Sequence, residues 1–117
     1  MTGPIGQPLR LSVRQVGSAM ILGVRGSAGM DAAEKLRLKL EELAAKQAPV
    51  IVVDLSGMDF ICSLGLGAII SGHLKCRHHN GQIKLVNPQQ AVMQLLETTR
   101  LTKLFPIYSS VDQALSS

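Results

Sequence analysis

The chain has 117 residues, of which 46% are hydrophobic and 17% are charged, and its net charge is +4. This length favours one domain with one core, and this balance excludes an intrinsically disordered chain. The chain has two Phe, one Tyr, no Trp and no long basic run, so we expect no binding to nucleic acid, which relies on base-stacking aromatic rings and dense positive charge.

The N-terminal residues do not have the composition of a signal peptide. Residues 1–8 are rich in Pro and Gly and predict a flexible N-terminal arm, followed by a domain over residues 9–117. A signal peptide and a stretch of 18 apolar residues are both lacking, so we expect no membrane span and a cytoplasmic location. Two cysteines, Cys62 and Cys76, are too few for a disulfide framework.

The first segment predicts an antiparallel hairpin. Apolar and polar residues alternate from Leu9 to Val16, which is typical of a half-buried strand. Gly17 and Ser18 form a two-residue turn with glycine first, and residues 19–24 return as the second strand. The Gly-Ser-Ala-Gly stretch at residues 26–29 predicts a loop.

The next segment predicts a helix that begins at a capping box. Asp31 is the expected cap, with Glu34 three residues later as its reciprocal partner. One apolar stripe at helical spacing follows, made of Ala33, Leu36, Leu40, Leu43 and Ala44. Pro49 follows the helix.

A central strand and a second helix follow. The continuous apolar run of residues 50–55 indicates a strand covered on both faces, and residues 58–61 indicate a loop. Residues 64–79 then have helical spacing, with an apolar face made of Leu66, Ile69, Ile70 and Leu74. Four small residues form a strip on this helix: Gly65, Ala68, Gly72 and Cys76. Both close packing on a neighbouring element and a docking surface for a partner agree with this strip.

The last elements complete an α/β pattern. Residues 82–86 predict a strand, and Asn87 and Pro88 open a helix as its cap and first residue. Residues 105–108 predict an edge segment, because Pro106 cannot lie in a central ladder, and Ser109 and Asp112 open a short last helix. We therefore expect one small α/β domain, with a mixed, mostly parallel sheet of four to five strands packed with about four helices.

Ser63 stands between the central strand and the second helix, and three roles are open to it. A hydrolytic nucleophile is disfavoured because the G-x-S-x-G motif fails at Ile61 and all three histidines lie on the following helix. A helix cap would contribute about 1 kcal/mol. A phosphorylation switch agrees with the cap, because a helix start favours negative charge. We expect no enzyme activity, no cofactor and no metal site, since the spacing of His73, Cys76 and His79 is too long for one ion.

The order of elements and three motifs resemble the STAS domain family, whose name joins sulfate transporters and anti-sigma factor antagonists. The motifs are V-V-D-L-S-G-M-D-F-I-C-S-L-G-L-G-A, Q-I-K-L-V-N-P and L-T-K-L-F-P-I-Y-S-S-V-D-Q-A-L, and the likeness runs from about Leu9 to Leu115. In free-standing bacterial members, a serine at the start of the second helix is phosphorylated by an anti-sigma factor kinase and reset by a phosphatase. The resemblance places this role on Ser63, with the family's G-L-G at Gly65 to Gly67.

The chain departs from the family pattern at two places. Cys62 stands where the family usually has an aspartate, immediately before the serine. Residues 26–29 stand where the family usually reads G-E-aliphatic-D. Both acidic groups are therefore lost, which suggests a different partner or a kinase with altered contacts.

The resemblance implies an anti-sigma factor antagonist that binds an anti-sigma factor serine kinase reversibly and so regulates transcription that depends on a sigma factor. The alternatives are a module that binds a lipid or nucleotide between the hairpin and the second helix, or a scaffold component of a stress-sensing assembly. Homo-oligomerisation is left open. The expected partner-binding residues are Ser27, Gly29, Cys62, Ser63, Leu64, Gly65, Gly67, Ala68 and Gly72.

Overall fold

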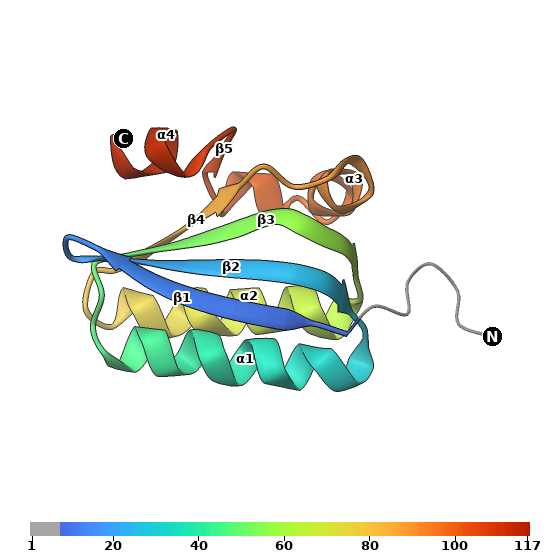
Figure 1. Cartoon of the computed structure of the whole chain (residues 1–117), viewed down its shortest axis with the longest axis horizontal. Coiled ribbons are helices and arrows are strands. Elements are labelled where there is room, and N and C mark those ends of the chain that lie inside the picture. Colours follow the sequence, from blue (N-terminus) through green and yellow to red (C-terminus); the bar gives the residue numbers. More distant parts are fainter. Residues whose placement is uncertain (1–7) are drawn as a thin grey trace.

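The computed structural model describes residues 8–117, so the predicted arm of residues 1–8 lies almost entirely outside the described residues (Figure 1). Five strands form one sheet: β1 Arg10–Val16, β2 Ala19–Ala28, β3 Val50–Ile61, β4 Gln82–Val86 and β5 Ile107–Tyr108. Their order across the sheet is their order along the chain. The β1–β2 pair is antiparallel and the other pairs are parallel, which confirms the predicted mixed sheet and its opening hairpin.

Helices cover the two faces of the sheet in two pairs. The helices are α1 Met30–Ala45, α2 Ser63–Arg77, α3 Gln90–Thr98 and α4 Val111–Leu115, with a 3-10 turn at Leu101–Lys103. Figure 1 shows α1 and α2 side by side below the sheet, and α3 and α4 above it. This arrangement confirms the α/β class and the expected number of helices. Within residues 8–117, no helix combines the length and the apolar character that a membrane crossing needs.

The central strand explains the two layers. Ile51 and Val53 point into the main core, whereas Val52 belongs to a smaller cluster on the other face with Ile21 and Val86. All three β3 side chains are fully buried, so the prediction of a strand covered on both faces is confirmed.

Both parallel strands at the centre are longer than predicted. β2 continues to Ala28 and β3 to Ile61, because Ser27 pairs with Phe60 and Ala28 with Ile61. The predicted loops at residues 26–29 and 58–61 are therefore wrong. The β2–β3 register shifts twice, between Gly23 and Arg25 and between Gly26 and Ser27, as it does at β-bulges. These shifts let the two strands remain paired beyond the irregular positions. The paired strands thus reach the start of α2 without an intervening loop.

The predicted starts of α1 and α3 are also displaced. Gly29 is the N-cap of α1, so Asp31 lies in the first turn and makes no cap hydrogen bond. Asn87 has a left-handed backbone (φ 49°), and α3 starts only after Gln89. The Gln89 Nε2 group donates a hydrogen bond to the Ser56 carbonyl, 2.8 Å away, which ties the start of α3 to β3.

The last helix is tied to the sheet by a buried lysine. Ser110, one residue after the predicted Ser109, caps α4 by accepting a hydrogen bond from the Gln113 N–H. Lys84 of β4 donates from Nζ to the carbonyls of Ala114 (2.9 Å) and Ser117 (3.0 Å). A cation at the C-terminal end of a helix is favourable, and here it holds α4 against the sheet.

Candidate functional site at the start of α2

Ser63 is the first residue of α2 and its side chain is exposed. The N-cap position belongs to Cys62, which has extended backbone geometry and makes no side-chain cap hydrogen bond. The prediction that Ser63 caps the helix is therefore wrong by one residue. Cys62 is anchored instead by its backbone, since its N–H donates to the Ala28 carbonyl at 3.0 Å.

The first turn of α2 offers free donors and no negative charge. The N–H groups of Ser63, Leu64 and Gly65 precede the first intrahelical hydrogen bond, which Leu66 N–H donates to the Cys62 carbonyl at 3.1 Å. This turn contains no acidic residue. Since the positive end of the helix dipole lies here, the position of Ser63 suits an added phosphate.

Two predicted partner-binding residues, Ser27 and Gly29, lie at the end of β2, and they differ in burial. Ser27 is buried, and its Oγ donates a hydrogen bond to Asp59 Oδ1 at 2.6 Å, which links β2 to β3. Its side chain is thus satisfied internally. Gly29 is half-buried, and a Cβ built on it would meet open space. Gly29 therefore belongs to the surface beside Ser63, whereas the side chain of Ser27 supports that surface from inside.

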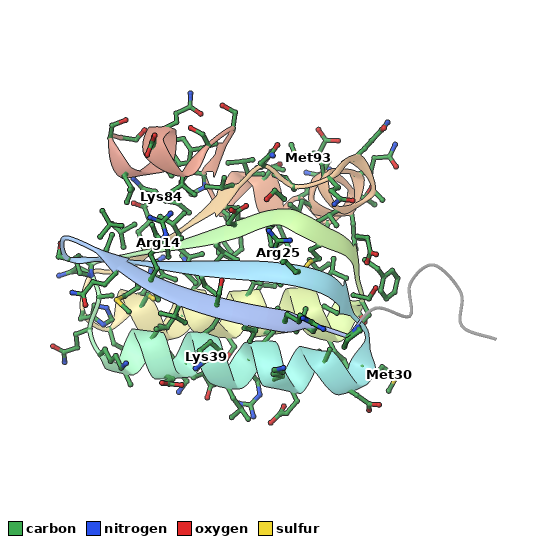
Figure 2. The ribbon with its side chains drawn as sticks, in the orientation of Figure 1. Arg14, Arg25, Met30, Lys39, Lys84 and Met93 are labelled. Carbon is green, nitrogen blue, oxygen red and sulfur yellow. The ribbon has the colours of Figure 1, made fainter. Side chains whose placement is uncertain are left out.

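An apolar groove lies beside Ser63 between the first turns of α1 and α2. Its volume is about 340 Å³, and it is lined by Met30, Ala33, Glu34, Arg37, Leu64, Gly67 and Ala68. Met30, which Figure 2 labels, is 73% exposed, and Leu64 is 54% exposed. Met30 is not among the predicted site residues, because the capping-box pattern puts the start of this helix at Asp31, whereas α1 begins at Met30. Exposed large apolar side chains next to each other are typical of a protein-binding surface.

The small-residue strip of α2 is buried, including Gly65, Ala68 and Gly72. A Cβ added to Gly72 would lie 3.1 Å from the Leu40 Cβ and 3.3 Å from the Ile83 Cδ1. The close-packing interpretation of the strip is therefore correct. The docking interpretation is wrong for Gly65 and Gly72, because the sheet and α1 occupy the space in front of them, whereas Ala68 lies at the floor of the groove.

The side chains considered for a metal site do not converge. Within residues 8–117, no group of three His, Cys, Asp or Glu side chains is placed to hold a metal ion. His73 lies edge-on to Phe105, with ring centroids 5.3 Å apart, whereas His79 Nε2 lies 3.0 Å from the Ala48 carbonyl. Burial lowers the pKa of His73 and raises the pKa of the Cys76 thiol, so both side chains favour their neutral forms.

The hairpin lines a cavity, but it shares this cavity with α4. The cavity has a volume of about 360 Å³ and is lined by Val16, Gly17, Ser18, Ala19, Val50, Lys84, Ala114, Leu115 and Ser117. The expected ligand pocket between the hairpin and the second helix is therefore not this one, because α2 lies on the opposite face of the sheet (Figure 1).

Comparisons with known proteins agree on one family. A family model described as the STAS domain matches residues 10–114. The chain is 27% identical over 120 residues to the anti-sigma-F factor antagonist RsfA of Mycobacterium tuberculosis, covering 99% of this chain and 92% of the relative. A crystal structure of an anti-sigma factor antagonist from Mycobacterium paratuberculosis superposes with a TM-score of 0.85 and 26% identity, covering 99% and 97% of the two chains.

A structure of the Bacillus cell fate determinant SpoIIAA in its phosphorylated form superposes with a TM-score of 0.73 and 16% identity, covering 92% and 97% of the two chains. At this identity the likeness concerns the fold.

Proposed function

The chain belongs to the STAS domain family, and from this premise we propose that it is an anti-sigma factor antagonist that binds its partner through the surface around Ser63. Relatives that align over nearly the whole chain carry this name. The observation that carries the proposal is an exposed serine in a carboxylate-free first turn, directly beside an apolar groove. The proposed surface consists of Gly29, Met30, Cys62, Ser63, Leu64 and Gly67.

We propose further that phosphorylation of Ser63 controls this binding. A phosphoserine adds about two negative charges and three hydrogen-bond acceptors. The free N–H groups of the first turn stabilise these charges, so the fold tolerates them. A partner that packs on Met30 and Leu64 meets a neutral hydroxyl before phosphorylation and a hydrated dianion after it. Desolvation of that dianion opposes binding and so releases the partner.

In this proposed role the protein binds a kinase and is phosphorylated by it, and the protein itself catalyses no reaction. Nucleophilic catalysis by serine requires a base within hydrogen-bond reach. The nearest histidine in the chain is His73, ten residues along α2, and it packs against Phe105. The kinase that we expect as partner would supply the chemistry, and a phosphatase would reverse it.

The test compares wild type with Ser63→Asp and Ser63→Ala in titration calorimetry against the anti-sigma factor kinase of the same organism, with ADP present. We expect Ser63→Asp to weaken binding at least tenfold, or about 1.4 kcal/mol, and Ser63→Ala to retain it. Incubation of wild type with kinase and ATP should place one phosphate on Ser63, detected by mass spectrometry. Ser116→Asp adds the same charge at the exposed C-cap position that follows α4 and serves as the matched control.

Equal binding by all three forms, with no phosphate on Ser63, would contradict the proposal. Lipid or nucleotide that copurifies with the protein in the absence of any kinase would favour the alternative of a small-ligand module.

A further inference from the structure

The upper face of the sheet is covered over only part of its width. Helices α3 and α4 pack on β3, β4 and β5, and Figure 1 shows them set back from β1. Ile21 of β2 lies under α4 with Ala114, and its neighbour in register on β1 is Arg14. Arg14 therefore lies on the same upper face, at the part that the helices leave open.

Three arginines occupy this open face. Arg10 lies four residues before Arg14 on the same strand, so both side chains point to the same side. Arg25 of β2 is directly opposite Arg10 in the antiparallel register and shares its face. All three side chains are exposed, and Figure 2 labels Arg14 and Arg25. We call Arg10, Arg14 and Arg25 the arginine face.

The arginine face forms no ion pair among the described residues. Like charges that lie directly opposite on neighbouring strands destabilise a sheet, and Arg10 and Arg25 form such a pair. Within residues 8–117, no carboxylate lies within ion-pairing distance of these three guanidinium groups, since all four ion pairs join residues of α1 and its C-terminal cap Lys46. Asp54 lies on this face beside Gly23, and its Oδ1 accepts a hydrogen bond from the Ser56 N–H at 3.0 Å.

The floor between the arginines lacks large side chains. Gly23 pairs with Ser12 on one side and with Asp54 on the other. Gly57 pairs with Arg25, whose Cγ lies 2.7 Å from the position that a Cβ of residue 57 would occupy. At both glycines a side chain of the neighbouring strand fills the space that a Cβ would take, Ser12 at Gly23 and Arg25 at Gly57. On β1 only the short, exposed Ser12 lies between Arg10 and Arg14 on this face, so an extended chain can lie along this strand between the two guanidinium groups.

We propose that the arginine face docks an extended acidic segment of a partner protein. The arginine guanidinium group donates a planar fork of hydrogen bonds that fits a carboxylate. Arg10 and Arg14 stand about 14 Å apart along β1, which equals four residues of an extended chain. Carboxylates at this spacing in the segment would contact both ends of the face and separate the charges of Arg10 and Arg25.

The aromatic residues of the chain favour a peptide over a nucleic acid. Phe105 is buried, the Tyr108 ring lies over Lys84 with 5.4 Å between Nζ and the ring centroid, and Phe60 lines a cavity with α3. None of these three rings belongs to the arginine face, which therefore lacks the platforms on which unpaired bases stack.

The test measures fluorescence anisotropy with a dye-labelled peptide of about twelve alternating Glu and Thr residues, and with the same peptide carrying Gln in place of Glu. We expect the Glu peptide to bind at least tenfold tighter than the Gln peptide at about 50 mM salt, and Arg25→Glu to remove this preference. The matched control is Arg77→Glu, which makes the same charge change at the exposed end of α2 on the opposite face. Equal loss in both variants, or equal binding of the two peptides, would overturn the proposal.

A second measurement does not depend on the peptide. Arg25→Glu replaces the Arg10–Arg25 repulsion by an attraction, so its melting temperature should rise by about 2–4 °C. A fall would show that the two like charges are already compensated. Tighter binding of a single-stranded DNA oligonucleotide or of vesicles rich in phosphatidylserine, with the same sensitivity to Arg25→Glu, would overturn the assignment to a peptide. Ser63→Asp should leave peptide binding unchanged, so this proposal and that for Ser63 fail separately.

Discussion

Helices α1 and α2 lie side by side on one face of the sheet, but α1 contributes large side chains to their contact and α2 contributes small ones. α1 contributes Leu36 and Leu40, which are fully buried, whereas α2 contributes Ala68 and Gly72. Bulk on one helix fits the space left by small residues on the other, and the two backbones can approach closely. The position of α2, and with it the position of Ser63, is therefore set largely by side chains that belong to α1.

The outer surfaces of the two helices differ as well. On α1, Arg37 binds Glu34 and Glu41, and this hydrogen bonding lowers the pKa of both carboxyl groups. On α2, the outward positions include Leu64 and Leu74, both more than half exposed. Leu74 was predicted to face the core, and the packing of small residues against α1 turns it outward instead. Both helices thus expose large apolar side chains, Met30 and Leu38 on α1 and Leu64 and Leu74 on α2, but among the described residues only α1 carries ion pairs on its surface.

The largest effect is expected from Ala68→Glu. Ala68 is 2% exposed at the floor of the groove, so a carboxylate there loses most of its hydration, and we expect a loss of about 3 kcal/mol or more in the free energy of unfolding. Urea denaturation measures this loss. Gly67→Glu, one residue earlier in open space, should leave the protein folded. A folded Ala68→Glu variant of ordinary stability would show that the strip faces solvent.

A loss of comparable size is expected when a large buried side chain of α1 is removed. Leu40→Ala deletes a buried side chain that lies against Gly72, which cannot fill the resulting cavity, and should cost about 2–5 kcal/mol. Leu38→Ala removes the same atoms from the exposed side of α1 and should change stability by less than about 0.5 kcal/mol. Similar losses in the two variants would mean that α1 does not supply the packing for α2.

A gain in stability is expected at the start of α2. Cys62 occupies the N-cap with extended geometry but has no side-chain cap hydrogen bond, and serine is among the preferred residues there. We expect Cys62→Ser to raise the free energy of unfolding by about 0.5–1 kcal/mol, measured by urea denaturation. Cys76→Ser, at a fully buried position on the same helix, should lower stability instead. A loss at Cys62 would show that its thiol packs in the core.

The smallest effect concerns how the stability of the protein depends on pH through His73, which packs against Phe105. Burial lowers the pKa of His73 in the folded state, so the unfolded state binds this proton more readily. The contribution of His73 to stability is therefore complete above its ordinary pKa of about 6.5 and declines as the pH falls below it. His73→Leu should flatten the dependence of the urea midpoint on pH between about pH 5 and 7, whereas His78→Leu, at an exposed position, should preserve it.

Most of the fold was predictable from local patterns. The apolar run at residues 50–55 and the leucine stripe of α1 identify a central strand and an amphipathic helix without reference to the rest of the chain. The ends of β2 and β3 were not predictable in this way. Residues 26–29 and 58–61 indicate loops locally, but pairing between two strands far apart in the sequence keeps residues 26–28 and 58–61 extended.

The candidate site was predictable only in part. The resemblance to a family placed Ser63 at the start of α2, where the structure also has it, but the cap role belongs to Cys62, because one residue separates an extended from a helical backbone. Whether the small-residue strip faces the protein interior or solvent depends on where α1 packs. The spacing of residues along α2 does not give the position of α1. The exposure of Met30 was not predictable from local spacing either. Met30 begins α1 beside the start of α2, and this placement depends on how the two helices pack on the sheet.

The order of the strands across the sheet bears on how the protein forms during synthesis. Because β1 to β5 are arranged as they follow in the chain, each strand leaving the ribosome adds to an edge that already exists, and none has to enter between two paired strands. The hairpin can form first, since a two-residue turn connects it. The last segment, α4, then packs over Lys84, which is the only buried lysine within residues 8–117, and the Ala114 carbonyl accepts a hydrogen bond from its Nζ.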